Sequence, residues 1–317
     1  MAITALYLDK LNIHMEKMLL ERMPEGVDVR FLDPVMGRKG ELEDADVFID
    51  TTYPVTRETI DAAPNLKLIQ RTGIGVDMID MAYAREKQIP VSVCRGFNSV
   101  SVAELAVLNI LALYRRLPFM DQTTKDGAFH TWLHRHKSYE LTGKTVGIVG
   151  AGNIGRNVIQ RVRAFDTTIL YYDPFRLPEK AEQELGITYT PLDSLFRQSD
   201  AVVMAGLPLN DGTRGMVGRE QIQSMKKTAV LVDTAREQLV DREALADALV
   251  SGDIIGAAID TFEPLPQDDP IYRAKDANLI VTPHIGAATY DNYDRVFRLC
   301  AGNLKRLMRG ECAERTI

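Results

Sequence analysis

Short runs of β-branched and other apolar residues alternate with amphipathic stretches along nearly the whole chain. This alternation is typical of parallel α/β sheets, in which each strand is followed by a helix that crosses back to the next strand. In the first part of the chain, helical periodicity occurs at 10–23 and 78–87. The strands predicted in this part are Thr4–Asp9, Val27–Leu32, Asp46–Asp50, Lys67–Arg71 and Pro90–Cys94.

A strongly apolar helix is predicted next, beginning at a capping box of Ser101 and Glu104 and ending near Arg116. Its length and apolarity favour a position between two domains over a place on the surface. A second run of strands and helices opens at Thr142, and its six predicted strands match a complete doubly wound domain. These strands are Thr145–Val149, Thr168–Asp173, Ala201–Leu207, Ala229–Asp233, Ile255–Ile259 and Leu279–Thr282.

One more helix is predicted at Tyr290–Arg309. Too few residues follow the second run of strands to build a third domain, so we expect this helix to fold back on the first domain. The 317 residues are therefore predicted to form two doubly wound α/β domains with parallel sheets. The first domain is discontinuous, residues 1–98 plus 288–317, and the second, residues 99–287, is inserted into it.

The composition, 45% hydrophobic and 26% charged residues, is typical of soluble globular proteins. The net charge is −6 without a basic run, which argues against nucleic-acid binding. We expect neither a signal peptide nor a membrane span, because the start lacks a basic, apolar leader and no long apolar window exists. Three cysteines without a CxxC pair predict reduced thiols in a cytoplasmic protein. His130, His134 and His136 have no acid or cysteine in their immediate neighbourhood to complete a ligand set, so no metal site is predicted.

A glycine-rich turn follows the strand predicted at Thr145–Val149 and opens a helical pattern. The first glycine permits the tight turn, the second lets the backbone approach a pyrophosphate, and the third lets helix and strand pack closely. Because the N-terminus of such a helix offers unpaired N–H groups to phosphates, the spacing predicts a dinucleotide site. Its residues are Gly150, Ala151, Gly152, Asn153, Ile154 and Gly155.

An acidic residue, Asp173, ends the next predicted strand, 18 residues after Gly155. A carboxylate at this place accepts hydrogen bonds from both hydroxyls of the adenosine ribose. It would also repel a 2′-phosphate, so NAD is favoured over NADP. Arg176 lies three residues further on and keeps NADP open as an alternative.

Three later segments place charged side chains just past the ends of predicted strands. Arg236 follows the strand Ala229–Asp233, Asp260 and Glu263 follow the next strand, and His284 follows the last one. The carboxyl ends of the strands line the ligand crevice of a doubly wound sheet. We therefore expect these side chains to converge on the cofactor.

With these motifs, the sequence resembles the D-isomer-specific 2-hydroxyacid dehydrogenases. The resemblance also rests on the runs RTGIGVD at 71–77, SVAE at 101–104 and LTGKTVGIVG at 141–150, and it covers nearly the whole chain in order. It implies a Rossmann NAD-binding domain inserted into a flavodoxin-like substrate domain, and usually a homodimer. The phosphoglycerate dehydrogenases are the branch that looks nearest, through RTGIGVD and the run NSVSVAEL at 98–105.

By position, the resemblance makes Arg236 the clamp for the substrate carboxylate and His284 the acid/base. It makes Asp260 the partner of the nicotinamide carboxamide, while Ile74 and Gly75 offer backbone N–H groups to the substrate. Arg71 is a candidate contact for a phosphate or second carboxylate of the substrate, with surface ion pairing as the alternative that we favour. Further cofactor contacts are implied at Asn153, Ile154, Leu207, Pro208, Thr213, Thr234, Ala235 and Gly286.

The catalytic glutamate of the family usually lies five residues after the aspartate that matches Asp260, where this chain has Leu265. We prefer a loop shortened by two residues, in which Glu263 supplies the carboxylate that keeps His284 protonated near neutral pH. In the alternative, Leu265 fills the position, and the pKa of a His284 without its carboxylate partner would be lower. Asp233 adds negative charge close to Arg236, which counts against phosphoglycerate as the substrate.

The predicted function is therefore an NAD-dependent interconversion of a small D-2-hydroxy acid and its 2-keto acid by hydride transfer. Phosphoglycerate, hydroxypyruvate and glyoxylate are the candidate types. The alternative is an NAD(H)-sensing binding protein of the same fold with little or no turnover. Arg236 and His284 favour the enzyme, whereas the displaced glutamate leaves room for the sensor.

Overall fold

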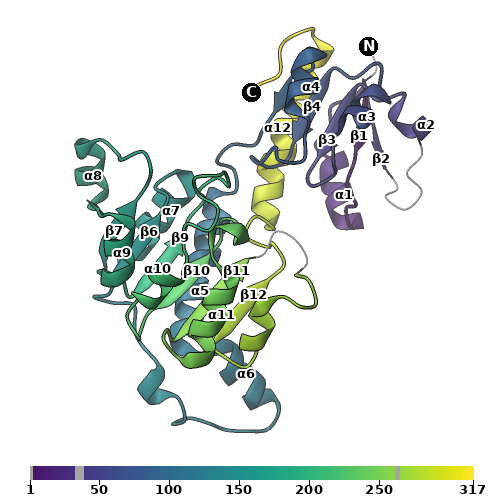
Figure 1. Cartoon of the computed structure of the whole chain (residues 1–317). Coiled ribbons are helices and arrows are strands. Elements are labelled where there is room, and N and C mark those ends of the chain that lie inside the picture. The colour runs from purple at the N-terminus through teal and green to yellow at the C-terminus, as the bar shows by residue number, and fades with distance from the viewer. Residues whose placement is uncertain (1–2, 33–38, 261–264) are drawn as a thin grey trace. The chain divides into compact units, whose positions relative to one another are not determined.

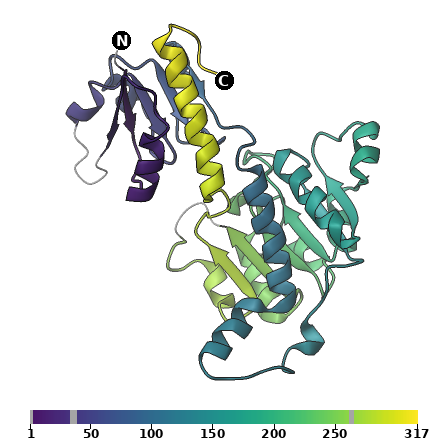
Figure 2. The same ribbon diagram turned by 180° about the vertical axis from the view of Figure 1, so that it is seen from behind.

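The computed structural model describes residues 3–32, 39–260 and 265–317 (Figures 1 and 2). The chain divides into two compact units, Met1–Asn98 with Thr289–Ile317, and Ser99–Ala288. They are called unit 1 and unit 2 below, and each is described by itself.

Unit 1 contains a five-stranded sheet in which every pairing is parallel, with the strand order β2-β1-β3-β4-β5. This is the flavodoxin-like order, as predicted for the first domain. The strands are β1 (Ile3–Tyr7), β2 (Val27–Phe31), β3 (Val47–Asp50), β4 (Leu68–Arg71) and β5 (Val91–Ser92). The helices between them are α1 (Ile13–Leu20), α2 (Lys39–Leu42), α3 (Arg57–Asp61) and α4 (Met81–Glu86).

The last helix of the chain, α12 (Tyr290–Met308), belongs to unit 1, as the sequence predicts. Thr289, the residue just before it, caps the helix, because its hydroxyl accepts from the Asn292 N–H. Its apolar side packs against β1, β3 and β4 through residues such as Phe297 and Leu304, and it lies along the sheet in Figure 2 (yellow). Asn303 secures the contact by donating to Gln70 Oε1 at 2.7 Å.

Unit 2 contains a seven-stranded parallel sheet with the order β12-β11-β10-β9-β6-β7-β8, which is a doubly wound arrangement of the Rossmann type. Its strands are β6 (Thr145–Val149), β7 (Thr168–Tyr172), β8 (Thr188–Tyr189), β9 (Ala201–Met204), β10 (Val230–Asp233), β11 (Gly256–Asp260) and β12 (Leu279–Thr282). Its α-helices are α5 (Ser99–Arg115), α6 (Leu117–Lys125), α7 (Asn153–Val162), α8 (Glu179–Leu185), α9 (Leu192–Gln198), α10 (Arg219–Gln223) and α11 (Arg242–Ser251).

Two local features of unit 2 differ from the prediction. The two-residue edge strand β8 was not predicted, because Thr188–Tyr189 is too short to show a period. The long apolar helix α5 already begins at Ser99, so Ser101 lies inside the helix and does not cap it. Within unit 2, α5 packs on α7 and on β10, β11 and β12, and Figure 2 shows it in front of that sheet. None of the described helices is both long and apolar enough to cross a bilayer.

Candidate active site

The turn between β6 and α7 has the geometry that its glycines predict. Gly150 has φ +99°, a left-handed conformation that favours glycine. A Cβ atom on Gly155 would lie 2.0 Å from the carbonyl oxygen of Gly150, so only glycine fits where the helix meets the strand. A Cβ on Gly152 would meet nothing within 4 Å, and no side chain caps α7 at this residue. The open backbone and uncapped helix start fit a pyrophosphate.

The carboxylate of Asp173 stands just after β7, beside this turn. Its Oδ2 accepts a hydrogen bond from the Ala151 N–H at 2.9 Å, and its Oδ1 accepts from the Phe175 N–H at 2.9 Å. A carboxylate has about four acceptor positions, so each oxygen can accept a further hydrogen bond. The backbone thus holds Asp173 in place while leaving it able to bind two ribose hydroxyls. These residues fit the adenosine half of NAD.

The segments after β9 and β10 carry several of the predicted cofactor contacts. The Thr213 hydroxyl donates to the carbonyl oxygen of Pro208 at 2.7 Å and so closes the loop that follows β9. The Thr234 hydroxyl donates to the Met204 carbonyl oxygen at 3.2 Å, which ties the end of β10 to that of β9. Two more of these residues, Leu207 and Ala235, are buried in the apolar core of unit 2. The side chains of Thr213, Thr234, Leu207 and Ala235 therefore support the loops after β9 and β10 from inside the unit.

The predicted carboxylate clamp, Arg236, lies three residues beyond the end of β10. It is half-buried, and its Nη1 donates to the carbonyl oxygen of Ala235 at 2.8 Å. The buried Asp233 turns the chain just before it by accepting from the Ala235 N–H at 2.9 Å. Arg236 is thus placed at the carboxyl end of the sheet by a local turn.

A single carboxylate organises the loop that carries His284. The Oδ1 of Asp260, at the end of β11, accepts from the Thr282 hydroxyl at 2.6 Å and from the Ile285 N–H at 2.8 Å. Its Oδ2 accepts from the Gly286 N–H at 2.8 Å, and a Cβ on Gly286 would lie 2.9 Å from that oxygen. Asp260 therefore holds the chain on both sides of His284, at Thr282 before it and at Ile285 and Gly286 after it. The sequence prediction did not include these hydrogen bonds.

The imidazole of His284 is exposed, and the residue has φ +51°, which is uncommon for a side chain larger than glycine. Such backbone strain persists only where neighbouring contacts determine it, and it is concentrated at functional sites. Because β10, β11 and β12 are neighbours in the sheet, Arg236, Asp260 and His284 all follow the same sheet edge. The sequence predicted that each of them lies at or just past the end of a strand; their convergence on a bound cofactor stays a prediction.

The predicted catalytic Glu263 lies outside the described residues. Leu265, the residue considered as its alternative, is described and packs against the apolar core of unit 2. Within the described ranges, His, Cys, Asp and Glu side chains do not gather into a group that could hold a metal ion.

The predicted substrate residues Arg71, Ile74 and Gly75 lie in unit 1, at and just after the end of β4. Arg71 is 3% exposed, and its Nη1 donates to the buried carboxylate of Asp50 at 2.7 Å. The favoured alternative was an ion pair, and an ion pair is present, but in the interior rather than on the surface. Ile74 is exposed and Gly75 half-buried.

Sequence reasoning did not single out Asp50, which ends β3 opposite Arg71 in the sheet register. Burial raises the pKa of this carboxyl group to about 6, and the Arg71 guanidinium opposes part of that rise. Nearby, Asp9 accepts from the Thr51 N–H at 2.5 Å and from the Thr52 N–H at 2.9 Å. The sequence signal that could have identified Asp50 is its place as a charged residue at the end of an apolar strand.

Comparisons with known proteins agree with this arrangement. The family model "D-isomer specific 2-hydroxyacid dehydrogenase, NAD binding domain" matches residues 107–286. A glyoxylate reductase of Korarchaeum cryptofilum is 36% identical over 85% of this chain and 82% of its own length. A hydroxypyruvate reductase of Thermotoga maritima is 41% identical over 76% of this chain and 78% of its own length.

Two further likenesses complete the comparison. A D-3-phosphoglycerate dehydrogenase of Methanocaldococcus jannaschii is 38% identical over 87% of this chain, which spans only 52% of that longer protein. A crystal structure of a Thermus thermophilus protein superposes with a TM-score of 0.85 at 31% identity, and the match covers 99% of this chain and 100% of that one.

Proposed function

Because this chain belongs to the D-isomer-specific 2-hydroxyacid dehydrogenase family, we propose that it interconverts small, unphosphorylated 2-keto acids, such as glyoxylate and hydroxypyruvate, with their D-2-hydroxy acids. Its NAD-dependent dehydrogenase activity follows from the family. The unphosphorylated substrate is our own inference.

The buried ion pair between Arg71 and Asp50 supports a substrate without a phosphate. Arg71 was a candidate contact for such a group, with ion pairing as the favoured alternative, and its guanidinium is indeed paired with Asp50 and 3% exposed in unit 1. Asp9 adds a carboxylate at the same carboxyl end of the sheet, where it binds the backbone of Thr51 and Thr52. An anionic phosphate would be repelled by the Asp9 carboxylate there, whereas an aldehyde hydrogen or a hydroxymethyl group would not.

We propose the following chemistry for the chain's own residues, from the family resemblance and their places at strand ends. The planar guanidinium of Arg236 binds the substrate carboxylate and polarises the adjacent keto oxygen. His284 donates its proton to that oxygen as the keto carbon is reduced, and it takes the hydroxyl proton in the reverse direction. NAD, when bound, supplies the hydride-transfer chemistry. The observation that carries this assignment is the Asp260 carboxylate, which holds the His284 loop from both sides.

We infer that Glu263 is the carboxylate partner of His284, because the partly buried Leu265 packs its side chain against the apolar core of unit 2 and so is not expected to occupy that position. A carboxylate keeps an imidazole protonated to higher pH. Glu263→Gln should therefore make keto-acid reduction fade at lower pH than in the wild type. An unchanged rate and pH profile would refute the assignment.

The substrate proposal is tested by following NADH absorbance with glyoxylate, hydroxypyruvate and phosphohydroxypyruvate. We expect kcat/KM for hydroxypyruvate to exceed that for its phosphorylated analogue by about 10²-fold or more, which corresponds to about 3 kcal/mol of discrimination. Equal or better turnover of phosphohydroxypyruvate would overturn the proposal. Tight NADH binding without turnover of any 2-keto acid would instead identify a sensor.

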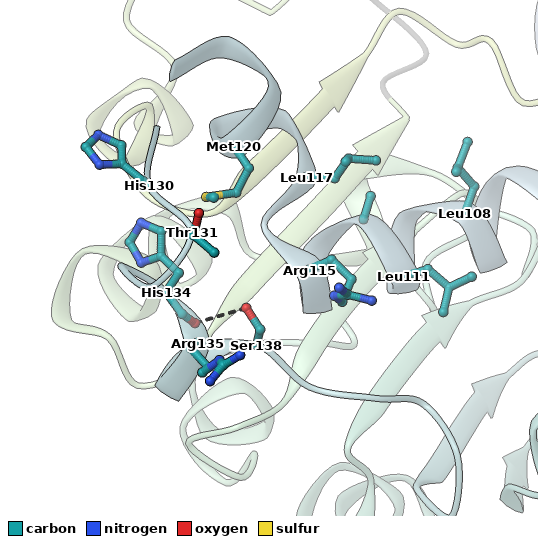
Figure 3. A pocket seen from close by; sticks show the side chains of 11 residues that line it. Leu108, Leu111, Arg115, Leu117, Met120, His130, Thr131, His134, Arg135 and Ser138 are labelled. Carbon is teal, nitrogen blue, oxygen red and sulfur yellow. Dashed lines mark hydrogen bonds between the residues drawn. The ribbon is translucent and has the colours of Figure 1, made fainter. Parts of the chain in front are cut away.

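The homodimer implied by the family resemblance is part of the proposal, and unit 2 offers a surface for it. A cavity of about 600 Å³ lies between α5, α6 and the segment before β6, lined by residues such as Leu108 and Met120 (Figure 3). Phe129 and Trp132, in that same segment, are 87% and 67% exposed. Exposed aromatic side chains around an apolar hollow are typical of protein interfaces.

The dimer proposal is tested by light scattering after gel filtration. The wild type should elute at twice the chain mass, and the double variant Phe129→Ser, Trp132→Ser at the chain mass. A wild-type monomer, or a dimer that survives the double substitution, would contradict the proposal that this surface forms the dimer interface.

We also propose a cytoplasmic location, which the free thiols of Cys94, Cys300 and Cys312 support.

A further inference from the structure

We propose that Glu182 sets the coenzyme preference of unit 2 by engaging Arg176, so that this arginine is not available to the 2′-phosphate of NADP. The proposal concerns the dinucleotide site alone. It does not depend on which 2-keto acid the enzyme reduces.

Arg176 belongs to the loop after β7, three residues beyond the ribose-binding Asp173. In dinucleotide-binding domains an arginine near this carboxylate can accommodate a 2′-phosphate. The Arg176 side chain is 60% exposed, so a ligand could approach it. By position and charge alone, this residue would therefore favour NADP, which is the alternative that the sequence left open.

The structure pairs this guanidinium with a carboxylate from the following helix, α8. Arg176 Nε donates to Glu182 Oε1 at 2.8 Å, and Nη2 donates to Glu182 Oε2 at 3.0 Å. Two parallel bonds of this kind are the strongest arrangement for an arginine and a carboxylate. The guanidinium also lies 5.1 Å from the centre of the Tyr189 ring on β8, which limits its freedom further.

Glu182 is itself held in place, because its side chain is only 10% exposed. Its Oε1 also accepts from the Tyr171 hydroxyl at 2.5 Å, and that hydroxyl accepts from the Leu177 N–H at 3.0 Å. The hydrogen bonds from Arg176 and Tyr171 lower the pKa of Glu182 to about 2. The pair is therefore ionised at every pH at which the enzyme would work.

The charge balance of the loop follows from these contacts. Asp173 and Glu182 carry two negative charges, and Arg176 carries one positive charge that Glu182 neutralises. A 2′-phosphate would meet the Asp173 carboxylate, while the guanidinium of Arg176 is already engaged by Glu182. Replacing Glu182 with glutamine keeps the size of the side chain but releases the guanidinium. Glu182 is thus a positioning residue that acts through Arg176.

The test compares the binding of NADH and NADPH, and of AMP and its 2′-phosphate, to the wild-type chain and to Glu182→Gln. We expect the substitution to tighten NADPH and 2′-phospho-AMP by about tenfold, a change typical of one added charge-assisted contact. Affinity for NADH and AMP should stay within about twofold. An unchanged ratio between the phosphorylated and unphosphorylated ligands would overturn the proposal.

Three controls separate this mechanism from a general loosening of the loop. In the double variant Glu182→Gln, Arg176→Ala the gain for NADPH should disappear, and a gain that persists would refute the role of Arg176. Tyr171→Phe removes one hydrogen bond to Glu182 but keeps the ion pair, so the ratio should not change. Arg176→Ala alone should not weaken NADPH relative to NADH. A selective loss there would show that Arg176 already binds the phosphate, and this test stands even if Glu182→Gln does not fold.

Discussion

At the scale of single residues, the site depends on two carboxylates that accept hydrogen bonds from backbone N–H groups. Asp173 accepts from the N–H groups of Ala151 and Phe175, and Asp260 accepts from those of Ile285 and Gly286. Each carboxylate fixes a loop at the carboxyl end of the sheet in unit 2. Loops determined in this way can hold a strained residue such as His284.

Replacing Asp260 with asparagine should therefore impair catalysis through the position of His284. The asparagine amide would present N–H donors to N–H groups that need an acceptor. Because small displacements of a catalytic group cost about 10²-fold in rate, we expect kcat to fall by about that factor. Steady-state kinetics measure it, and Thr282→Val, which removes one donor only, should have a smaller effect. A wild-type kcat in Asp260→Asn would contradict this role.

The burial of the Asp50 carboxyl group in unit 1 predicts a pH dependence of stability. The pKa of Asp50 is about 6 in the folded chain against an ordinary 3.8, so the folded state binds a proton more tightly than the unfolded state. The stabilisation of the folded state by this proton is fully present below the pKa that Asp50 has in the unfolded chain. It is lost as the pH rises through 6, the pKa of Asp50 in the folded chain. The difference between the two pKa values corresponds to about 3 kcal/mol.

Calorimetric unfolding from about pH 4 to about pH 7 measures how the free energy of unfolding changes as Asp50 loses its proton. The double variant Asp50→Asn, Arg71→Met removes both charges, which avoids leaving Arg71 buried without a partner. Relative to this variant, the wild type should lose stability as pH rises from about 4 to about 7. A difference that does not vary with pH, or that grows with pH, would show that the pKa of Asp50 is not raised.

At the scale of elements, the junction of β6 and α7 connects the fold to the cofactor. Two glycines of one motif have different neighbours there, because a Cβ on Gly155 would clash with the Gly150 backbone whereas a Cβ on Gly152 would meet no protein atom. Glycine at 155 is required by the packing of the helix on the strand. Glycine at 152 is required only if a ligand approaches the backbone there.

This difference predicts two distinct phenotypes. Gly155→Ala should destabilise unit 2 by about 1–3 kcal/mol, since neither the strand nor the helix can move away easily. Gly152→Ala should leave the melting temperature nearly unchanged and weaken NADH binding by about tenfold or more. Thermal unfolding and NADH titration of both variants provide the comparison. Equal stability losses, or a Gly152→Ala variant with wild-type affinity, would contradict the assignment.

At the scale of the whole molecule, the sequence predicted most of the architecture because most of its strands are short runs of β-branched and other apolar residues. Two of them, β6 and β12, have the predicted bounds, and the fold class is confirmed. The edge strand β8 was missed because two residues show no period.

The partners of individual charges were harder to predict than the elements. Asp50 and Arg71 lie 21 residues apart in sequence and meet only because β3 and β4 are neighbours in register. Glu182 likewise reaches Arg176 from the next helix. Such pairs depend on strand order and on helix placement, which local patterns do not contain. The positions of Asp173, Arg236, Asp260 and His284 were predictable because each lies at or within three residues of the end of an apolar strand run.

Arg236 and His284 are proposed above to carry out the reduction of a 2-keto acid. The most direct measurement is the rate of hydroxypyruvate reduction by wild type, Arg236→Ala and His284→Ala, together with NADH affinity for each. We predict that His284→Ala lowers kcat by about 10²–10⁴-fold, that Arg236→Ala chiefly raises KM, and that both bind NADH like the wild type. Turnover that survives in His284→Ala at the wild-type rate would contradict the account.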